Sequence, residues 1–455
     1  MSNFDLVVLG GGSGGYAASL RAAQLGLSVA LIEADKLGGT CLHRGCIPTK
    51  ALLHAGEIAD GARDASHFGV NATFNSIDMA GVNSYKDGIV TKLHKGLQGL
   101  VKSRNITYIE GHGKLVAKDI VEVNGQRYTG KNVLLATGSY ARTLPGLDID
   151  GQRVITSDQG LTMEYVPKSV IVLGGGVIGC EFASVWKSFG SEVTIIEGLP
   201  HLVALEDESS SKQLERAYRK RGINLELGVR FKSHVVTPAG VTVTLEDGKT
   251  FSAELLLVAV GRGPTSANLG YEEQGLTMDR GYLIVDNKCR TNISGIWAVG
   301  DLIPTLQLAH VGFAEGILVA EEIAGLNPTP INYDGVPRVT YSEPEVASVG
   351  LTTAQAKERG FDVVELNYDL AGNGKAQILR TAGSVKLVSE KDGRVLGIHM
   401  VGARVGELLA EAQLIFNWEA SAKDVAPLIH AHPTLSEAMG EAHMALAGKP
   451  LHAHG

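Results

Sequence analysis

The chain has 455 residues, of which 44% are hydrophobic and 20% are charged, and its formal net charge at pH 7 is −8. This length exceeds what one hydrophobic core usually organises, and it predicts about three to four domains. The acidic balance argues against general binding to nucleic acids or anionic membranes, and no apolar run approaches the roughly 20 residues of a membrane-spanning helix.

The first predicted elements are a strand, a glycine-rich loop, a helix and a second strand. Residues 4–9 form an apolar run typical of a buried strand, and a helix is expected at 16–25. The second strand, at 28–32, ends on Glu33. This order, with an acidic residue at the end of the second strand, is typical of a dinucleotide-binding fold.

Three glycines in the loop each have a physical purpose in such a fold. Gly10 permits a tight turn, Gly12 lets the backbone approach a pyrophosphate, and Gly15 allows close packing of helix on strand. The helix N-terminus attracts phosphate, and Glu33 is placed to accept hydrogen bonds from an adenosine ribose. The flanking elements favour a dinucleotide site over an ordinary glycine-rich turn.

Two closely spaced cysteines follow, within the stretch 36–50. A disulfide between Cys41 and Cys46 would close a short loop and add little stability, so easy opening and closing is the favoured purpose. A metal site needs about four ligands, and Cys180 and Cys289 lie far away in sequence. The sequence therefore favours a redox pair over a metal site or two inert core thiols.

The nucleotide pattern occurs a second time, which indicates two nucleotide-binding modules. Gly174, Gly176 and Gly179 follow a predicted strand at 169–173, and the next strand ends on Glu197. An acid at this position would repel a 2′-phosphate, and residues 198–205 contain no arginine. The second module is therefore predicted to bind NAD(H) in preference to NADP(H).

Further motifs extend the first module. The loop Gly10 to Glu33, the segment Ala136-Thr-Gly138 and the pair Gly300-Asp301 resemble the FAD-binding set of the two-dinucleotide flavoprotein reductases. In those proteins the aspartate holds the ribitol chain. Without its neighbours, Asp301 would equally suit a loop-capping acid.

The cysteine stretch resembles the redox motif of the pyridine nucleotide-disulfide oxidoreductases. The segment His430 to Glu437 resembles the active-base motif of that family, most closely its dihydrolipoamide dehydrogenase branch. Residues 343–350 and 395–402 resemble its dimer-interface domain. The resemblance covers essentially the whole chain.

The resemblance implies an α/β fold with two Rossmann-like domains, a central domain and a C-terminal α+β dimer-interface domain. We expect an FAD-binding domain with the redox disulfide at 1–145, an NAD-binding domain at 146–268, a central domain completing the FAD site at 269–333, and the interface domain at 334–455. The FAD residues implied are Gly10, Gly12, Gly15, Glu33, Thr40, Lys50, Gly113, Thr137, Gly138, Ser139, Asp301, Leu308, Ala309 and His310. The NAD residues implied are Gly174, Gly176, Gly179, Glu181, Glu197 and Gly261, and no metal is expected.

Roles for the catalytic residues also follow from the resemblance. Cys41 is expected to exchange with substrate and Cys46 to face the flavin, while His432 acts as the base and Glu437 orients it. The base is expected to reach the disulfide of the other subunit of a homodimer. A lone histidine is more often a packed or surface residue, but the surrounding motif favours catalysis.

Three charged positions carry further expectations. Arg44, between the cysteines, is expected to lower their pKa, and Lys50 is expected to pair with Glu181 near the flavin. Without the family, a solvated helix residue is the better interpretation of Lys50. A metal site formed by His430 and His432 is the weaker alternative to a base, since no third ligand is evident.

The implied activity is NAD⁺-dependent oxidation of protein-bound dihydrolipoamide. Expected partners are the lipoyl domains and acyltransferase core of 2-oxo acid dehydrogenase complexes, with the glycine-cleavage carrier as another candidate. Four cysteines and an N-terminus without signal-peptide features favour the cytoplasm. A related NAD(P)H-dependent flavin disulfide reductase, a transhydrogenase or NADH oxidase, and a non-catalytic scaffold remain as alternatives.

Some positions depart from the common form of the family. His43 and Arg44 stand where Asn-Val is often seen, Gly263 replaces an arginine, and Gly312 replaces an alanine. None of these changes removes a catalytic role, but the first pair is expected to alter the thiol pKa.

Overall fold

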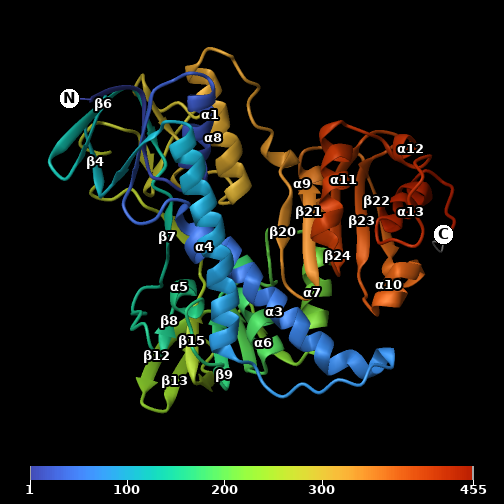
Figure 1. Cartoon of the computed structure of the whole chain (residues 1–455). Helices are drawn as coiled ribbons and strands as arrows, with labels where there is room; N and C mark the ends of the chain where they lie inside the picture. Colours follow the sequence, from blue (N-terminus) through green and yellow to red (C-terminus); the bar gives the residue numbers. More distant parts are fainter. Residues whose placement is uncertain (1, 453–455) are drawn as a thin grey trace. The chain divides into compact units, whose positions relative to one another are not determined.

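The computed structural model describes residues 2–452 (Figure 1). Contacts within the chain divide this part into two compact units. The first unit comprises residues 2–52, 78–142 and 261–333, and the second comprises residues 53–77, 143–260 and 334–452. Each unit is assembled from segments that are distant in sequence.

A seven-stranded sheet forms the centre of the first unit. Its order is β3-β2-β1-β6-β5-β4, with β19 also pairing with β6. The strands β1, β2, β3, β6 and β19 run parallel, whereas β4, β5 and the start of β6 form antiparallel hairpins. The bounds are β1 Ser2–Leu9, β2 Val29–Glu33, β3 Thr107–Glu110, β4 Gly113–Ala117, β5 Ile120–Val123, β6 Gln126–Leu135 and β19 Ile296–Ala298.

Two helices pack closely together on this sheet, α1 (Ser13–Gln24) and α8 (Ala309–Ile323) (Figure 1). A Cβ at Gly316 would lie 2.2 Å from the carbonyl oxygen of Gly14, so the contact requires glycine. A Cβ at Gly312 would lie 3.1 Å from Oγ of Ser13. The glycine that replaces the usual alanine at position 312 therefore leaves room for the Ser13 hydroxyl.

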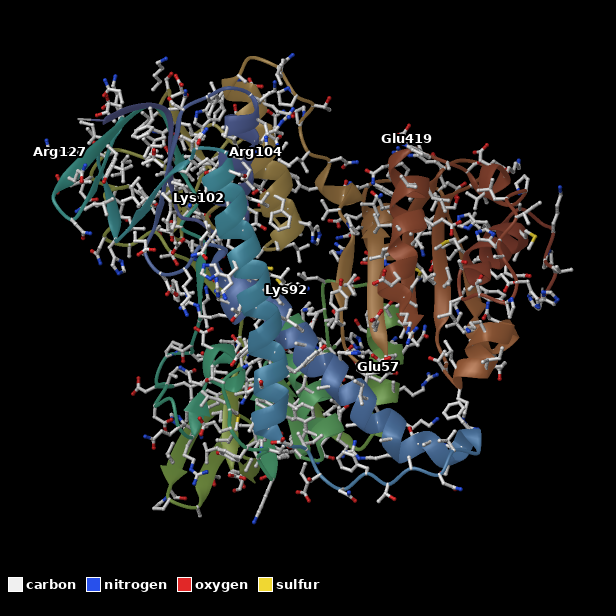
Figure 2. All side chains as sticks on the ribbon, viewed as in Figure 1. Glu57, Lys92, Lys102, Arg104, Arg127 and Glu419 are labelled. Atoms are coloured by element: carbon white, nitrogen blue, oxygen red, sulfur yellow. The ribbon has the colours of Figure 1, made fainter. Side chains whose placement is uncertain are left out.

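The remaining helices of the redox region are α2 (Gly39–Arg44), α3 (Cys46–Asp64) and α4 (Met79–Ser103). On α4, apolar residues such as Leu97 and Val101 join the hydrophobic core under the sheet. Its exposed side carries charged side chains, including Lys92 and Lys102 (Figure 2). This amphipathic pattern is what a helix covering one face of a sheet requires.

The second unit contains a five-stranded parallel sheet in the order β11-β10-β9-β15-β8. A three-stranded antiparallel sheet, β12-β13-β14, accompanies it. The bounds are β8 Val154–Ile155, α5 Ser157–Gly160, β9 Ser169–Leu173, α6 Val177–Phe189, β10 Glu192–Glu197, α7 Glu208–Lys220, β11 Ile223–Leu227, β12 Phe231–Thr237, β13 Gly240–Leu245, β14 Thr250–Ala253 and β15 Leu255–Val258.

The C-terminal part of the second unit is an antiparallel sheet, β20-β21-β24-β23-β22, with helices packed on it. The bounds are β20 Arg338–Thr340, β21 Glu345–Gly350, α9 Thr353–Glu358, β22 Val363–Asp369, α10 Gly374–Leu379, β23 Ser384–Glu390, β24 Val395–Gly402, α11 Val405–Asn417, α12 Ala422–Val425 and α13 Glu437–Leu446.

The short strands of the first unit are β7 Ser139–Ala141, β16 Arg262–Pro264, β17 Met278–Asp279 and β18 Tyr282–Leu283. The 3-10 turns are Ala65–Phe68, Gly300–Leu302, Tyr333–Gly335 and Leu370–Gly372.

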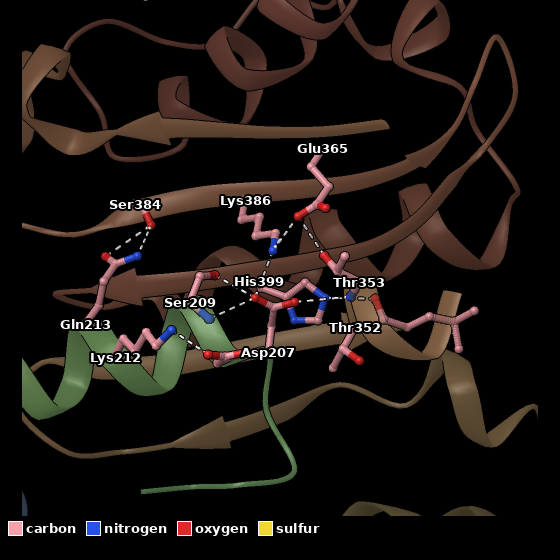
Figure 3. A network of polar contacts seen from close by, with 12 residues as sticks. Asp207, Ser209, Lys212, Gln213, Thr352, Thr353, Glu365, Ser384, Lys386 and His399 are labelled. Atoms are coloured by element: carbon pink, nitrogen blue, oxygen red, sulfur yellow. Dashed lines mark hydrogen bonds and ion pairs between the residues drawn. The ribbon is translucent and has the colours of Figure 1, made fainter. Parts of the chain in front are cut away.

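A buried polar network ties this sheet to the start of α7 (Figure 3). Lys386 Nζ lies 2.9 Å from Asp207 and 2.8 Å from Glu365. Burial acts to raise the pKa of Asp207, but hydrogen bonds from Ser209, Lys386 and the Thr353 N–H outweigh it and hold that pKa well below its usual range. The network thus keeps a buried carboxylate charged.

The observed architecture confirms the expected α/β class with two nucleotide-binding sheets. The strand expected at 169–173 has those bounds, and α1 begins three residues before its expected start. The division into four domains stays a prediction. No α-helix within residues 2–452 combines the length and hydropathy needed to cross a bilayer.

Candidate functional site

Cys41 and Cys46 lie side by side where α2 ends at Arg44 and α3 begins at Cys46, with Gly45 between the two helices. Cys41 belongs to α2, and Cys46 is the first residue of α3. Both are half-buried thiols, and a side-chain hydrogen bond joins them. This bond and burial raise the pKa of Cys41, and the Lys50 charge opposes the rise. Ionisation of Cys41 is therefore disfavoured while the two thiols remain in contact.

Arg44 pairs with an acid on the loop that precedes α2. Its guanidinium lies 3.4 Å from Asp35, and both side chains are about half exposed. The cation that acts to lower the pKa of Cys41 is Lys50. Because Asp35, on the preceding loop, binds this side chain, we expect a smaller effect of Arg44 on the thiols than the sequence suggests, and this effect stays a prediction.

The neighbouring His43 contacts the loop that precedes α2 and a histidine on α4. Its Nε2 lies 3.0 Å from the carbonyl oxygen of Leu37, and its ring meets the ring of His94 edge-on at 4.8 Å. Burial lowers the pKa of His94, and the nearby His43 and Lys36 add to that effect. The two histidines fasten α2 to α4.

The two glycine loops have the same geometry. Gly12 and Gly176 cap α1 and α6 with φ/ψ of −72°/−171° and −75°/−174°. Neither helix has a side-chain cap, so its first N–H groups are available to an anion. In each loop the next acid binds the backbone: Glu33 Oε2 accepts from the Gly11 N–H at 2.6 Å, and Glu197 Oε2 accepts from the Gly175 N–H at 2.5 Å.

Steric space around these loops fits a bound pyrophosphate. A Cβ at Gly15 would lie 1.8 Å from Gly10 O, and one at Gly179 would lie 1.9 Å from Gly174 O. By contrast, nothing lies within 4 Å of a Cβ at Gly176, and at Gly12 the nearest atom is 3.9 Å away. The outer glycines serve packing, and the middle glycine leaves its space to a ligand.

Asp301 follows β19 and lies beside the segment 136–139. The Ser139 hydroxyl donates to Asp301 Oδ2 at 2.5 Å, and Arg262 lies 3.9 Å from the same oxygen. The Gly300 N–H donates to Glu315 at 2.6 Å, which fixes the loop from the other side. Burial raises the pKa of Glu315. Asp301 is therefore held in place by neighbours on two sides.

His432 and Glu437 form the expected pair. His432 Nδ1 lies 2.8 Å from Glu437 Oε1, and the other carboxylate oxygen accepts from the Thr434 N–H at 2.7 Å. Partial burial acts to raise the pKa of Glu437, but these two hydrogen bonds outweigh it and lower the pKa. The His432 side chain is 78% exposed in the single chain. Its Nε2 edge is therefore free to meet a partner.

A second histidine–acid pair supports this loop. His430 Nε2 lies 2.8 Å from Glu411 on α11, and a Cβ at Gly440 would lie 2.5 Å from His430 Nδ1. His430 is thus enclosed by packing, and not directed at a shared metal with His432. Among residues 2–452, no group of three or more His, Cys, Asp or Glu side chains is arranged to hold a metal ion.

The other expected site residues lie where the glycine loops and strand ends place them. Glu181 is buried on α6, where it accepts from the Tyr341 N–H at 3.0 Å, and its pairing with Lys50 stays a prediction. Gly113 permits packing, because a Cβ there would lie 2.5 Å from Leu9. The remaining positions are Thr40 on α2, Thr137, Gly138 and Gly261 next to the paired strands β7 and β16, and Leu308, Ala309 and His310 at the start of α8.

Two residues in this region were missed from sequence. Neither Arg262 nor Glu315 was assigned a role from the sequence. A buried acid amid apolar helix positions is a signal that could have identified Glu315. Nothing local in the sequence connects Arg262 with Ser139 or Asp301.

Known proteins match this chain along nearly its whole length. The model of the pyridine nucleotide-disulphide oxidoreductases matches residues 4–316, and the model of their dimerisation domain matches residues 336–443. The second match supports a homodimer. The dihydrolipoyl dehydrogenase of Bacillus subtilis (strain 168) is 41% identical over 99% of both chains. The mitochondrial dihydrolipoyl dehydrogenase of Pisum sativum is 38% identical over 98% of this chain and 92% of its own.

The solved structures give the same result. The crystal structure of LpdA from Mycobacterium tuberculosis superposes with a TM-score of 0.91 at 28% identity, covering 98% of this chain and 100% of that one. The resemblance inferred from the sequence motifs is confirmed. The chain belongs to the pyridine nucleotide-disulphide oxidoreductase family, whose cofactors are FAD and NAD(H).

Proposed function

We propose that this protein oxidises protein-bound dihydrolipoamide to lipoamide and reduces NAD⁺ to NADH. The observation that carries the proposal is the contact between the thiols of Cys41 and Cys46. Identity of 38–41% to relatives named dihydrolipoyl dehydrogenase, along nearly the whole chain, supports the choice of substrate.

The thiol chemistry begins with the cysteine pair as a disulfide. His432 removes the proton of one substrate thiol, and the resulting thiolate attacks the sulfur of Cys41, so that Cys46 leaves as a thiolate. The second substrate thiol then loses its proton to solvent, and its sulfur attacks the first substrate sulfur, which forms lipoamide and releases Cys41 as a thiolate. His432 gives its proton to Cys41, in keeping with the raised pKa of that thiol. Glu437 orients the ring and stabilises its charge throughout.

The two glycine loops would hold the cofactors. The Gly10–Gly15 loop would bind the FAD pyrophosphate, with Asp301 on the ribitol chain, and the Gly174–Gly179 loop would bind NAD(H). FAD, when bound, accepts the electron pair of the dithiol and passes it to NAD⁺. Glu197 favours NAD⁺, because a 2′-phosphate would meet its carboxylate.

The site is completed by a second copy of the chain. The exposed His432 and the matched dimerisation domain support a base that acts on the dithiol of the other subunit. The proposed partners are lipoyl domains with the acyltransferase core of a 2-oxo acid dehydrogenase complex, or the glycine-cleavage carrier. The low cysteine content supports a cytoplasmic location.

Steady-state turnover of the purified protein tests the proposal. We expect dihydrolipoamide to drive NADH formation at 340 nm, with NADP⁺ at least roughly tenfold poorer in kcat/KM. Cys46→Ser is expected to abolish this reaction. A protein that transfers hydride between nicotinamide nucleotides but leaves dihydrolipoamide untouched would favour the transhydrogenase alternative.

A further inference from the structure

The two segments that leave and re-enter the first unit pair with each other next to Asp301. Strands β7 and β16 are antiparallel, with Arg262 opposite Ala141 and Pro264 opposite Ser139. The Arg142 N–H donates to Gly261 O at 3.0 Å, and the Thr265 N–H donates to Gly138 O at 2.8 Å. This pairing fixes the backbone from which the Arg262 side chain starts.

Arg262 directs its guanidinium at one residue with two hydrogen bonds. Its Nε donates to the Ser139 hydroxyl oxygen at 2.7 Å, and its Nη2 donates to the Ser139 carbonyl oxygen at 2.7 Å. The Arg262 side chain is only 14% exposed. A buried arginine with two such bonds holds its acceptor in one position.

The direction of the hydrogen bonds follows from the chemistry of the groups. Arginine only donates and stays charged, so the Ser139 oxygen must accept from Arg262. The hydroxyl proton of Ser139 is then left for Asp301 Oδ2. Within residues 2–452, Asp301 Oδ1 has no hydrogen bond or ion pair, and the side chain is 25% exposed. One carboxylate oxygen is thus engaged by protein, while the other is available to a ligand hydroxyl.

A side chain at position 263 would meet the side chains of two exposed residues on and next to β7. A Cβ at Gly263 would lie 2.8 Å from Cζ of Tyr140 and 3.0 Å from Nε of Arg142. Tyr140 therefore takes the space beside β16 that a larger residue at 263 would need. Gly263, which departs from the common form of the family, therefore lies opposite a large side chain, Tyr140 on β7.

We propose that Arg262 is a positioning residue of the FAD site, which acts through Ser139 to present Asp301 as a charged hydrogen-bond acceptor to the ribitol hydroxyls. The inference rests on the proposed role of Asp301. Arg262 itself need not touch the cofactor. Its effect is to fix the rotamer of Asp301 and the proton of Ser139 before FAD arrives.

The affinity for FAD tests this role separately from turnover. FAD is removed from the full-length protein, and its return is titrated by the quenching of flavin fluorescence. We expect Arg262→Gln to raise the Kd for FAD roughly tenfold, since a charged hydrogen bond is lost. Arg262→Lys should recover part of the affinity, because it keeps the charge but not the fork. Arg142→Gln is the matched control. The Arg142 side chain is exposed and donates to Tyr282 at 3.5 Å, so the FAD affinity of this variant should stay within about twofold of the parent.

A double-mutant cycle distinguishes action through Ser139 from a general structural effect. Ser139→Ala and Arg262→Gln should be non-additive, so that the double variant binds FAD about as weakly as the weaker single variant. Additive losses, or unchanged affinity in Arg262→Gln, would overturn the inference. If Asp301→Asn also binds FAD normally, the proposed role of Asp301 fails as well. If Asp301→Asn weakens FAD binding but Arg262→Gln does not, the role of Asp301 stands and only the role of Arg262 fails.

Discussion

His432 Nδ1 lies 2.8 Å from Glu437 Oε1, while the His432 side chain is 78% exposed. We expect Glu437→Gln to slow dihydrolipoamide oxidation on the order of 10²-fold, because the amide cannot stabilise the imidazolium that forms on proton transfer. Stopped-flow measurement of the reductive half-reaction checks this. Reduction of the flavin by NADH, which does not need the base, should stay unchanged in the same variant.

The pair His452–Glu441 provides a control for this experiment. It has the same 2.8 Å spacing, but its histidine lies near the C-terminal end of the described chain. His452→Gln should leave both half-reactions within about twofold, because the His452 side chain is 64% exposed. An equal loss in His452→Gln would mean that such pairs act through stability and not through catalysis.

Substitutions of Lys50 and Arg44 are expected to differ in their effect on the pKa of Cys41. Lys50 acts to lower the pKa of Cys41, so Lys50→Met should raise that pKa and shift iodoacetamide labelling of the reduced protein to higher pH. Arg44→Met should leave the labelling profile in place, because Arg44 pairs with Asp35. A shift in the Arg44 variant with none in the Lys50 variant would reverse the assignment.

Two substitutions in the second glycine loop are expected to affect NAD⁺ binding and stability separately. Gly176→Ala should fold normally, since its Cβ enters open space, but should lose NAD⁺ affinity because the methyl group occupies the path of the pyrophosphate. Gly179→Ala should lower stability by about 1–3 kcal/mol or more, since its Cβ would lie 1.9 Å from Gly174 O. Thermal unfolding and NADH binding of both variants measure the two effects. Normal NAD⁺ affinity in Gly176→Ala would exclude this loop as the pyrophosphate site.

Lys386 is predicted to contribute strongly to stability. Lys386→Met leaves Asp207 and Glu365 without their shared cation and should cost about 3 kcal/mol in the free energy of unfolding. Lys357 also reaches Glu365, at 3.2 Å, but its side chain is 59% exposed, so Lys357→Met should cost at most about 1 kcal/mol. Urea titration of the two variants compares them, and similar losses would remove the distinction between the buried and the exposed lysine.

The features predicted correctly from sequence are those encoded within a short stretch. Each glycine loop carries its strand, turn, helix and acid within one continuous segment, and the two loops proved to share a geometry. The order of the motifs was enough to identify the family.

The features that were missed depend on residues distant in sequence. Arg262 and Ser139 are separated by the whole second nucleotide module, so no local pattern relates them. Arg44 stands between the two thiols in the sequence, whereas in the structure its side chain pairs with Asp35. Side-chain direction around a short helix is set by tertiary contacts, and these are not encoded in spacing.

The hydrogen bond from the Arg142 N–H to Gly261 O brings together the two ends of the intervening segment 143–260. Residues 143–260 are therefore a continuous insertion that begins and ends at neighbouring positions of the first unit. A short direct peptide link between residues 142 and 261 would therefore be enough to close the chain of the first unit without residues 143–260.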